Sequence, residues 1–327
     1  MGTLISHLGT AEGGALQRIH MLSGIRDAVI IYNPTAGRGR HRRRTQLERA
    51  QSILKQAGIL TELEATTGPG SATEQARTAV ADGRQLVIGC GGDGTINEIV
   101  NGLARSQVPL GVLPGGTANV LVKELSLPWD IPRAAEQLAR GTLRRIALGL
   151  ALSEELPGGR RYFICTAGAG PDGKLVNAVD VETKRRLGIL AYWMEGFRQM
   201  VEYTFPAFRV ITAEQQHTVS LVVVGRTKHY GGPVMITTEA DLFEDRFEVF
   251  VATTQKRWRY ATDMIKLLCG RHRTIADDFF WKTTSVRCEP SGGEDIWAQV
   301  DGEPIGRLPV DFQIVPDALT LVVPSHS

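Results

Sequence analysis

Four glycines within six residues, in the segment 89–94, form the part of the sequence best suited to bind a charged ligand. The apolar run Leu86–Ile88 before them predicts a buried strand, and apolar residues at helical spacing follow from Ile96 to Leu103. Where side chains are absent, backbone N–H groups can approach a ligand closely, and the N-terminus of the next helix favours an anion. A polyphosphate is the expected ligand, although a tight turn without a ligand fits the same pattern.

Two common nucleotide-binding motifs do not account for this segment. The chain contains no Gly-x-x-x-x-Gly-Lys-Ser/Thr sequence, which excludes an ordinary nucleoside-triphosphatase loop. Gly89, Gly91 and Gly94 match the glycine spacing of dinucleotide-binding folds. However, Leu113–Thr117 lies where that motif places an acidic residue for the ribose, and it contains none. The dinucleotide interpretation is therefore weak.

The composition is that of a folded protein with a substantial core. The chain has 327 residues, 43% of them hydrophobic and 22% charged, which is enough for two domains or one large one. The net charge of +2 provides no general attraction to nucleic acid. Four cysteines without metal-like spacing are typical of reduced thiols and favour a cytoplasmic protein. No apolar run is long enough to predict a transmembrane helix.

Strands and helices are expected to alternate in the first half of the chain. The expected strands are 28–32, 60–65, 86–88 and 109–113, and the expected helices are 46–57, 72–81 and 133–140. This alternation predicts a parallel sheet with helices on both faces. Loops rich in Gly, Thr and Asn follow the first, third and fourth strands, at the edge where such sheets bind ligands. Residues 1–26 are expected to be a poorly ordered extension, or Met21 is the true start.

The short β-rich runs of the second half predict a mainly antiparallel β domain, either a sandwich or a barrel. Its expected strands are 161–165, 208–212, 219–224, 247–252, 285–288, 296–300 and 319–323. Residues 187–200 are an exception, because they are apolar almost all round and predict a helix. That helix would either line a cleft or belong to the core.

Together, collinear segments in both halves resemble the diacylglycerol kinase catalytic family, a group that includes bacterial lipid kinases and sphingosine kinases and is related to NAD kinases. The segments are Asn33–Gly37, Gly91–Glu98, Leu113–Asn119, Ala167–Asp172, Tyr230–Gly232, Leu242–Asp245 and Val300–Glu303. The resemblance covers residues 28–324. It implies an ATP-binding α/β domain over 27–145, joined by the C-terminal segment 310–327, and a β-sandwich domain for a lipid substrate over 146–309.

The resemblance also implies roles for individual residues. Glu303 resembles the general base of the family, with Asp301 beside it, and Asp245 resembles its magnesium-site aspartate, flanked by the backbone carbonyls of Leu242 and Phe247. The residues expected to bind ATP are Asn33, Pro34, Thr35, Ala36, Gly37, Thr66, Gly92, Asp93, Gly94, Thr95, Ile96, Asn97, Glu98 and Thr117. Phosphoryl transfer needs a metal that bridges phosphate oxygens and an acceptor for the hydroxyl proton, which these residue types supply. The pair Asp301-Gly302 would also suit a simple hairpin turn.

The predicted function is ATP- and Mg²⁺-dependent phosphorylation of a hydroxyl group on a diacylglycerol-like lipid. The alternatives are a kinase for sphingoid bases or other lipids, a soluble-substrate enzyme of the NAD kinase type, and a nucleotide- or lipid-binding regulator with little activity. Four positions depart from the family pattern, and they leave the identity of the lipid open. They are Arg246, where the family usually has Gly, and Val120, Cys165 and Ala147.

The expected partners are a lipid substrate and a peripheral membrane surface, with no nucleic acid, and a homodimer remains open. Three basic segments, 38–44, 184–186 and 256–260, offer cations to anionic headgroups, and the first could also meet ATP phosphates. We therefore expect a cytoplasmic protein that associates with membranes peripherally and in a salt-sensitive way.

Overall fold

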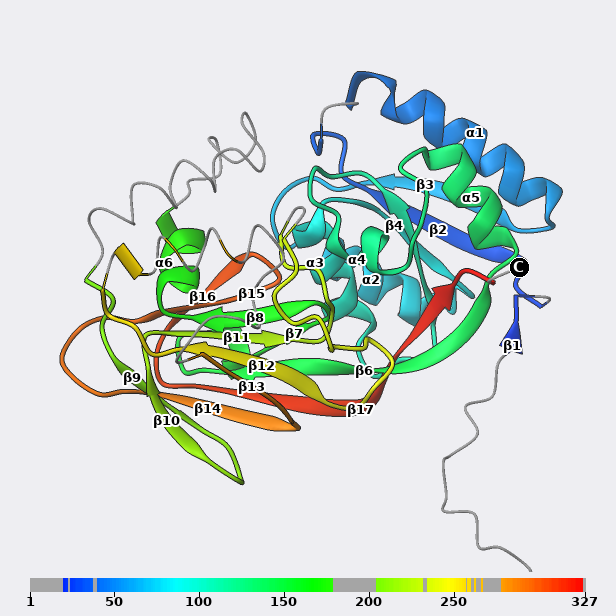
Figure 1. Cartoon of the computed structure of the whole chain (residues 1–327). Coiled ribbons are helices and arrows are strands. Elements are labelled where there is room, and N and C mark those ends of the chain that lie inside the picture. Colours follow the sequence, from blue (N-terminus) through cyan, green and yellow to red (C-terminus); the bar gives the residue numbers. More distant parts are fainter. Residues whose placement is uncertain are drawn as a thin grey trace, which may run out of the picture.

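The computed structural model of the chain describes residues 20–22, 24–37, 40–178, 204–231, 234–256, 258–259, 262, 266 and 278–325. Figure 1 shows a part rich in helices beside a part built of strands, with two long strands running through both. The helix expected at 187–200, the basic segment 184–186 and most of the expected extension 1–26 lie outside the described residues.

The first part is the predicted parallel sheet, in the spatial order β5-β4-β2-β3. Its strands are β2 (Asp27–Tyr32), β3 (Leu60–Ala65), β4 (Val87–Gly91) and β5 (Leu110–Pro114). Its helices are the short 3₁₀ turn η1 (Arg40–Arg42), α1 (Arg43–Gln56), α2 (Ser71–Ala81), α3 (Asp93–Leu103), α4 (Val120–Glu124) and α5 (Ile131–Ala139). All of the elements expected here are present, within a few residues of their predicted bounds.

Helices cover both faces of this sheet because β2, β4 and β5 are apolar on both sides. Ile30 of β2 packs into a core formed with α1 and α5, whereas its neighbours Val29 and Ile31 pack into a core formed with α2 and α3. Successive strand residues point to opposite faces, so a continuous apolar run is buried from both sides. Figure 1 shows α1 and α5 together on one side and α2 and α3 on the other.

Two long antiparallel strands, β6 (Thr142–Leu152) and β17 (Val310–Val323), join the two parts. The C-terminal end of β17 lies parallel to β5, with Leu321 opposite Leu110, so the C-terminal segment returns to the first part. The sequence predicted a strand only over 319–323 and none over 142–152. The proposed domain boundary at 145/146 falls within β6, and the domain limits remain a proposal.

The second part contains a six-stranded antiparallel sheet in the order β13-β12-β11-β8-β15-β16. Its strands are β8 (Thr166–Ala169), β11 (Leu221–Gly225), β12 (Phe247–Ala252), β13 (Asp278–Thr283), β15 (Trp297–Val300) and β16 (Glu303–Arg307). The other elements are β1 (His20–Met21), the 3₁₀ turn η2 (Pro157–Gly159), β7 (Arg160–Phe163), α6 (Pro171–Ala178), β9 (Phe208–Ile211), β10 (Gln216–Val219) and β14 (Ser285–Pro290). The run expected over 219–224 is divided, because Val219 ends β10 and Leu221 begins β11.

The six-stranded sheet packs against the antiparallel part of the larger sheet, and an apolar core fills the space between them. Phe163 lies between Phe247 and Phe312 in this core, with ring centroids 5.7 and 6.0 Å from its own. The predicted fold class, a parallel sheet with helices on both faces plus a mainly antiparallel β sandwich, is therefore confirmed.

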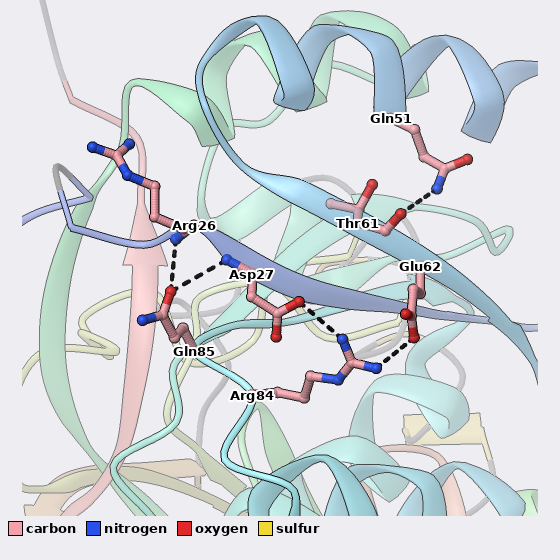
Figure 2. Close-up of polar contacts among 7 residues, drawn as sticks. All are labelled: Arg26, Asp27, Gln51, Thr61, Glu62, Arg84 and Gln85. Atoms are coloured by element: carbon pink, nitrogen blue, oxygen red, sulfur yellow. Dashed lines mark hydrogen bonds and ion pairs between the residues drawn. The ribbon is translucent and has the colours of Figure 1, made fainter.

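The amino ends of the parallel strands are tied together by polar side chains, as Figure 2 shows. Arg84 donates to Asp27 and to Glu62, and the Gln85 side-chain oxygen accepts from the backbone N–H groups of Arg26 and Asp27. These partly exposed ion pairs are worth at most about 1 kcal/mol each, so their main effect is to set the relative positions of the strands. A ligand would bind at the opposite, carboxyl edge of the sheet.

Candidate active site

Three loops leave the carboxyl ends of β2, β4 and β5, and the last two pack backbone against backbone. A Cβ atom on Gly115 would lie 2.5 Å from the backbone nitrogen of Gly91, and one on Gly116 would lie 2.4 Å from the Cα atom of Gly92. No side chain fits at either position. The glycines therefore bring two polypeptide segments close together where the sequence predicts a phosphate site.

A buried arginine joins these loops to the loop after β2. Arg43 at the start of α1 is 4% exposed, and its Nη2 atom donates to the carbonyl oxygens of Ala36 (2.8 Å) and Gly115 (2.7 Å). Its Nη1 atom lies 3.4 Å from the Cys90 sulfur, and burial raises the pKa of that thiol. Arg43 was expected to be one of several cations facing ATP or headgroups. Its guanidinium instead supports the loops from within.

The loop after β2 also contacts the first turn of α3. The side-chain oxygen of Asn33 accepts from both the backbone N–H and the hydroxyl of Thr35, each at 2.9 Å. The Asn33 amide nitrogen lies 3.3 Å from the hydroxyl oxygen of Thr95. Three residues predicted to bind ATP are therefore brought together at the carboxyl edge of the sheet.

The α3 helix begins at Asp93, directly after the glycine turn, with Gly92 as its N-cap residue. Gly92 has no side chain to cap the first turn, so an anion bound there would meet N–H groups and the positive end of the helix dipole. The Asp93 carboxylate accepts from the backbone N–H groups of Asn119 (3.0 Å) and Val120 (2.7 Å). Asp93 thereby fixes the loop after β5 against the glycine turn.

Two other residues predicted to bind ATP have structural partners elsewhere, and two lie at the expected edge of the sheet. The Glu98 carboxylate accepts from the N–H groups of Gly70 and Ala72 at the start of α2, and Ile96 is buried in the core. The backbone N–H of Thr66 donates to the carbonyl of Tyr32, beside the loop after β2. Thr117 is exposed in the loop after β5. Of these four, Thr66 and Thr117 lie at the expected edge of the sheet.

A buried carboxylate fixes the turn that carries the predicted base. Asp301, between β15 and β16, accepts from three consecutive backbone N–H groups, those of residues 164–166, at 2.9–3.0 Å. It also accepts from the Asn97 side chain at 2.9 Å. Burial raises the pKa of Asp301, and these hydrogen bonds oppose the rise. With four donors on its two oxygens, Asp301 is suited to positioning the turn.

Glu303 reaches from the second part of the molecule to the start of α3. Its Oε1 atom lies 2.6 Å from the position that a Cβ atom on Gly94 would occupy, so a side chain at position 94 would displace this carboxylate. Glu303 is the first residue of β16, and Gly94 lies in the first turn of α3. The predicted base and the predicted phosphate turn therefore meet, although 209 positions separate them in the sequence.

Behind Glu303 lies a chain of buried hydrogen bonds that the sequence did not predict. The N–H of Gly302 donates to Gln299 Oε1 (2.9 Å), and Gln299 Nε2 donates to Asp172 Oδ2 (2.8 Å). Burial raises the pKa of Asp172 to about 7, and its Oδ1 atom has no hydrogen-bond partner among the described residues. Asp172 belongs to a segment that resembles the family, but no motif spacing indicated its link to the turn.

The segment predicted to bind magnesium has an arginine against one of its predicted ligands. Asp245 is exposed, and the Leu242 carbonyl already accepts from Nη2 of Arg226 at 2.6 Å. Phe247 begins β12 opposite Thr283 of β13. No group of three or more His, Cys, Asp or Glu side chains suited to a metal occurs in the described part of the chain. These residues fit a magnesium ion poorly, and Arg226 had no signal in the sequence.

Comparisons with known proteins cover both parts of the molecule. Residues 27–151 match the family described as diacylglycerol kinase catalytic domain, and residues 165–323 match the family described as YegS C-terminal NAD kinase beta sandwich-like domain. A diacylglycerol kinase of Bacillus subtilis is 31% identical over 91% of this chain and 97% of its own length. One from Staphylococcus aureus strain MRSA252 is 29% identical over 87% of this chain and 88% of its own.

Solved structures share the fold. A crystal structure of a diacylglycerol kinase from Bacillus anthracis superimposes with a TM-score of 0.72, covering 92% of this chain and 98% of that one, at 23% identity. At this identity the likeness extends to the arrangement of both parts and not to individual site residues.

We predict that Asp172→Asn weakens the dependence of stability on pH. The folded-state pKa of about 7 exceeds the ordinary value of 3.8, so between these values the folded protein holds a proton that the unfolded chain releases. Stability therefore falls as pH rises from about 4 to about 7, by about 1.4 kcal/mol per unit of pKa difference. The variant, which cannot ionise, should melt at a higher temperature than the wild type at pH 8, with a smaller difference at pH 5.

Melting curves at pH 5 and pH 8 measure this effect. Asp295→Asn is the control, because Asp295 is exposed and pairs with Arg307 at the surface. Identical pH dependence in Asp172→Asn and the wild type would contradict a neutral carboxyl group at this position.

Proposed function

The chain belongs to the diacylglycerol kinase catalytic family and is a phosphotransferase with an alcohol group as acceptor, and we propose that it transfers the γ-phosphate of ATP to a hydroxyl of a diacylglycerol-like lipid. The observation that carries this proposal is the contact between Glu303 and the start of α3. A proton acceptor from one part of the chain lies beside an anion-binding helix N-terminus from the other.

The nucleotide side of the proposal rests on the three loops. Backbone N–H groups at the start of α3, the closely packed glycines and the polar side chains of Asn33, Thr35 and Thr95 suit the phosphates of ATP. ATP supplies the phosphoryl group when bound, and Mg²⁺ would arrive with it as the counter-ion of the phosphates. Arg43 and Asp93 hold the loops in place, so they would act on ATP affinity indirectly.

Glu303 is proposed to accept the proton of the lipid hydroxyl. Its carboxylate lies at the junction of the two parts, and the turn before it is held by Asp301 and Gln299. A base that is held rigidly can be aligned with its substrate in advance. We assign Asp301 a positioning role, because four donors already engage its oxygens.

A lipid acceptor is favoured by the family, and the rival acceptors can be tested directly. None of the helices in the described ranges is long and apolar enough to cross a membrane. Purified protein is to be incubated with radiolabelled ATP and, separately, diacylglycerol, sphingosine or NAD. Labelled diacylglycerol alone supports the proposal, and a labelled sphingoid base or NAD would replace it. Tight ATP binding without labelling of any acceptor would indicate a regulator.

The first prediction from this proposed function separates the roles of Glu303 and Asp301. Glu303→Gln keeps the shape of the side chain but removes its proton affinity, so turnover should fall about 10²–10⁴-fold while ATP affinity and Tm hardly change. Asp301→Asn should lower both turnover and Tm. Its amide NH₂ group would point hydrogens at backbone N–H groups that now donate to the carboxylate. Turnover, ATP affinity and Tm are measured for both. A larger turnover loss at unchanged Tm in Asp301→Asn would make Asp301 the base.

The second prediction concerns Asp93. Asp93→Ala frees the start of α4 and the loop after β5, which should raise the KM for ATP about 10- to 100-fold and lower turnover. Asp130→Ala is a matched control, since Asp130 caps α5 by accepting from the Arg133 N–H away from the loops. Steady-state kinetics at varied ATP concentration measure the KM and the turnover of both variants. Wild-type KM and turnover in Asp93→Ala would show that the nucleotide site lies elsewhere.

The third prediction is salt-sensitive binding to anionic membranes. Trp258, 67% exposed, lies within the basic segment 256–260, and each exposed cation near an anionic surface contributes roughly 1 kcal/mol. Flotation with anionic liposomes should recover the protein at low salt and lose it at high salt. Trp258→Ala should weaken recovery, whereas Trp129→Ala, which removes an exposed tryptophan elsewhere, should not. Equal recovery with neutral liposomes at high salt would exclude electrostatic binding.

A further inference from the structure

A fully buried arginine lies beneath the segment that the family resemblance assigns to magnesium. Arg226 directly follows β11, is 0% exposed, and donates from Nη2 to the carbonyl of Leu242 (2.6 Å) and from Nη1 to the carbonyl of Glu244 (3.2 Å). Its backbone N–H donates to the carbonyl of Cys165 on the neighbouring chain segment. The guanidinium is therefore held from the six-stranded sheet and directed at the backbone of the loop before β12.

That loop, residues 241–247, is closed by its own hydrogen bonds. Asp241 Oδ1 accepts from the Phe243 N–H (2.9 Å), and the Asp241 carbonyl accepts from the Glu244 N–H (3.0 Å), which together form a tight turn. The Glu244 carboxylate pairs with Lys282 of β13 at 2.9 Å. Arg226 donates hydrogen bonds to two carbonyl oxygens of this turn, so a cation already contacts these carbonyls.

A magnesium ion at the same oxygen would compete with this guanidinium. Mg²⁺ binds oxygen at about 2.1 Å, so an ion on the Leu242 carbonyl would lie within about 4.7 Å of Arg226 Nη2. Two cations would then share one carbonyl in a buried place where water screens them little. Asp245, the only carboxylate among the three predicted ligands, is exposed, and its charge raises the pKa of Arg226 against the larger, opposite effect of burial.

We propose that Arg226 takes the place of the magnesium ion at this loop, so that the 241–247 segment is held by a built-in cation and binds no divalent metal of its own. Magnesium then enters the enzyme only with the nucleotide. The Arg246 side chain, which replaces the usual glycine, is exposed and is not the group that fills this position.

The position of the loop explains why a permanent cation would be useful there. The Leu242 side chain is buried in the core of the first part of the molecule, and the Phe243 ring lies 3.7 Å from the guanidinium carbon of Arg144 on β6. The loop thus connects the six-stranded sheet to the helical part near the active site. A covalently attached cation holds this connection at any magnesium concentration.

The wild-type protein provides the first test. Nucleotide-free, full-length protein is titrated with Mn²⁺, and free Mn²⁺ is measured by electron paramagnetic resonance, with Asp245→Asn beside it. We expect that the wild type binds no more Mn²⁺ than Asp245→Asn does. The Tm of the wild type should be the same in excess Mg²⁺ as in EDTA. One bound Mn²⁺ per chain that is lost in Asp245→Asn would overturn the proposal, as would a Tm that EDTA lowers in the wild type but not in Asp245→Asn.

A variant tests the replacement directly. Arg226→Ala frees both carbonyls and opens space, which should lower Tm by roughly 5–10 °C in EDTA. Excess Mg²⁺ should then raise the Tm of Arg226→Ala, but not of Arg226→Ala/Asp245→Asn. Arg43→Ala is the matched control, because it also removes a buried arginine from two backbone carbonyls, and Mg²⁺ should not restore it.

An unchanged Tm in Arg226→Ala, or an equal gain from Mg²⁺ in the wild type, would contradict the proposal. If Arg226→Ala does not fold, the Mn²⁺ titration of the wild type decides alone. Every readout is binding or melting of nucleotide-free protein, so the outcome does not depend on which acceptor the enzyme phosphorylates.

Discussion

The arrangement of the candidate active site depends on the burial of one carboxylate, that of Asp301. Removing an ionised carboxylate from water is very costly unless hydrogen bonds replace the lost hydration, and Asp301 has four. Three of its donors are the successive N–H groups of residues 164–166, which run from the end of β7 to the first residue of β8, and the fourth is Asn97 of α3. The carboxylate therefore binds both parts of the molecule at once. Any shift of the β15–β16 turn would leave buried polar groups unpaired, which keeps Glu303 beside Gly94.

A second interaction occurs at two loops of the molecule, where a buried arginine donates hydrogen bonds to several backbone carbonyls. Arg43 draws together the loops after β2 and β5, and Arg226 holds the loop before β12. A planar group with several donors in fixed directions can satisfy carbonyls from different segments, which a lysine cannot do as well. Burial lowers the pKa of Arg226 to about 10. The charged side chains of Arg43 and Arg226 therefore hold these loops in shape.

The sequence predicted the helices and strands of the first part because apolar residues recur there at strand or helix spacing, and glycine or proline bounds most of the segments. It missed β6 and the first half of β17, where charged residues such as Arg144 and Arg145 interrupt the apolar pattern and pairing between the strands decides the structure. Motif resemblance singled out Glu303, which lies beside the glycine turn, and its role as the base stays a prediction. The resemblance could not reveal Asp172 or Arg226, because their roles arise from contacts between residues far apart in the chain.

Several motif residues are engaged by other parts of the protein, and this bears on substrate choice. Four motif residues have carboxylate or amide groups that form hydrogen bonds with other parts of the protein, and they thereby preserve the shape of the site. They are Asp93, Asn97, Glu98 and Asp301. On the proposed function, this frame would present Glu303 to the acceptor hydroxyl. Selection of the acceptor would then depend on residues that contact it and not on these motif residues.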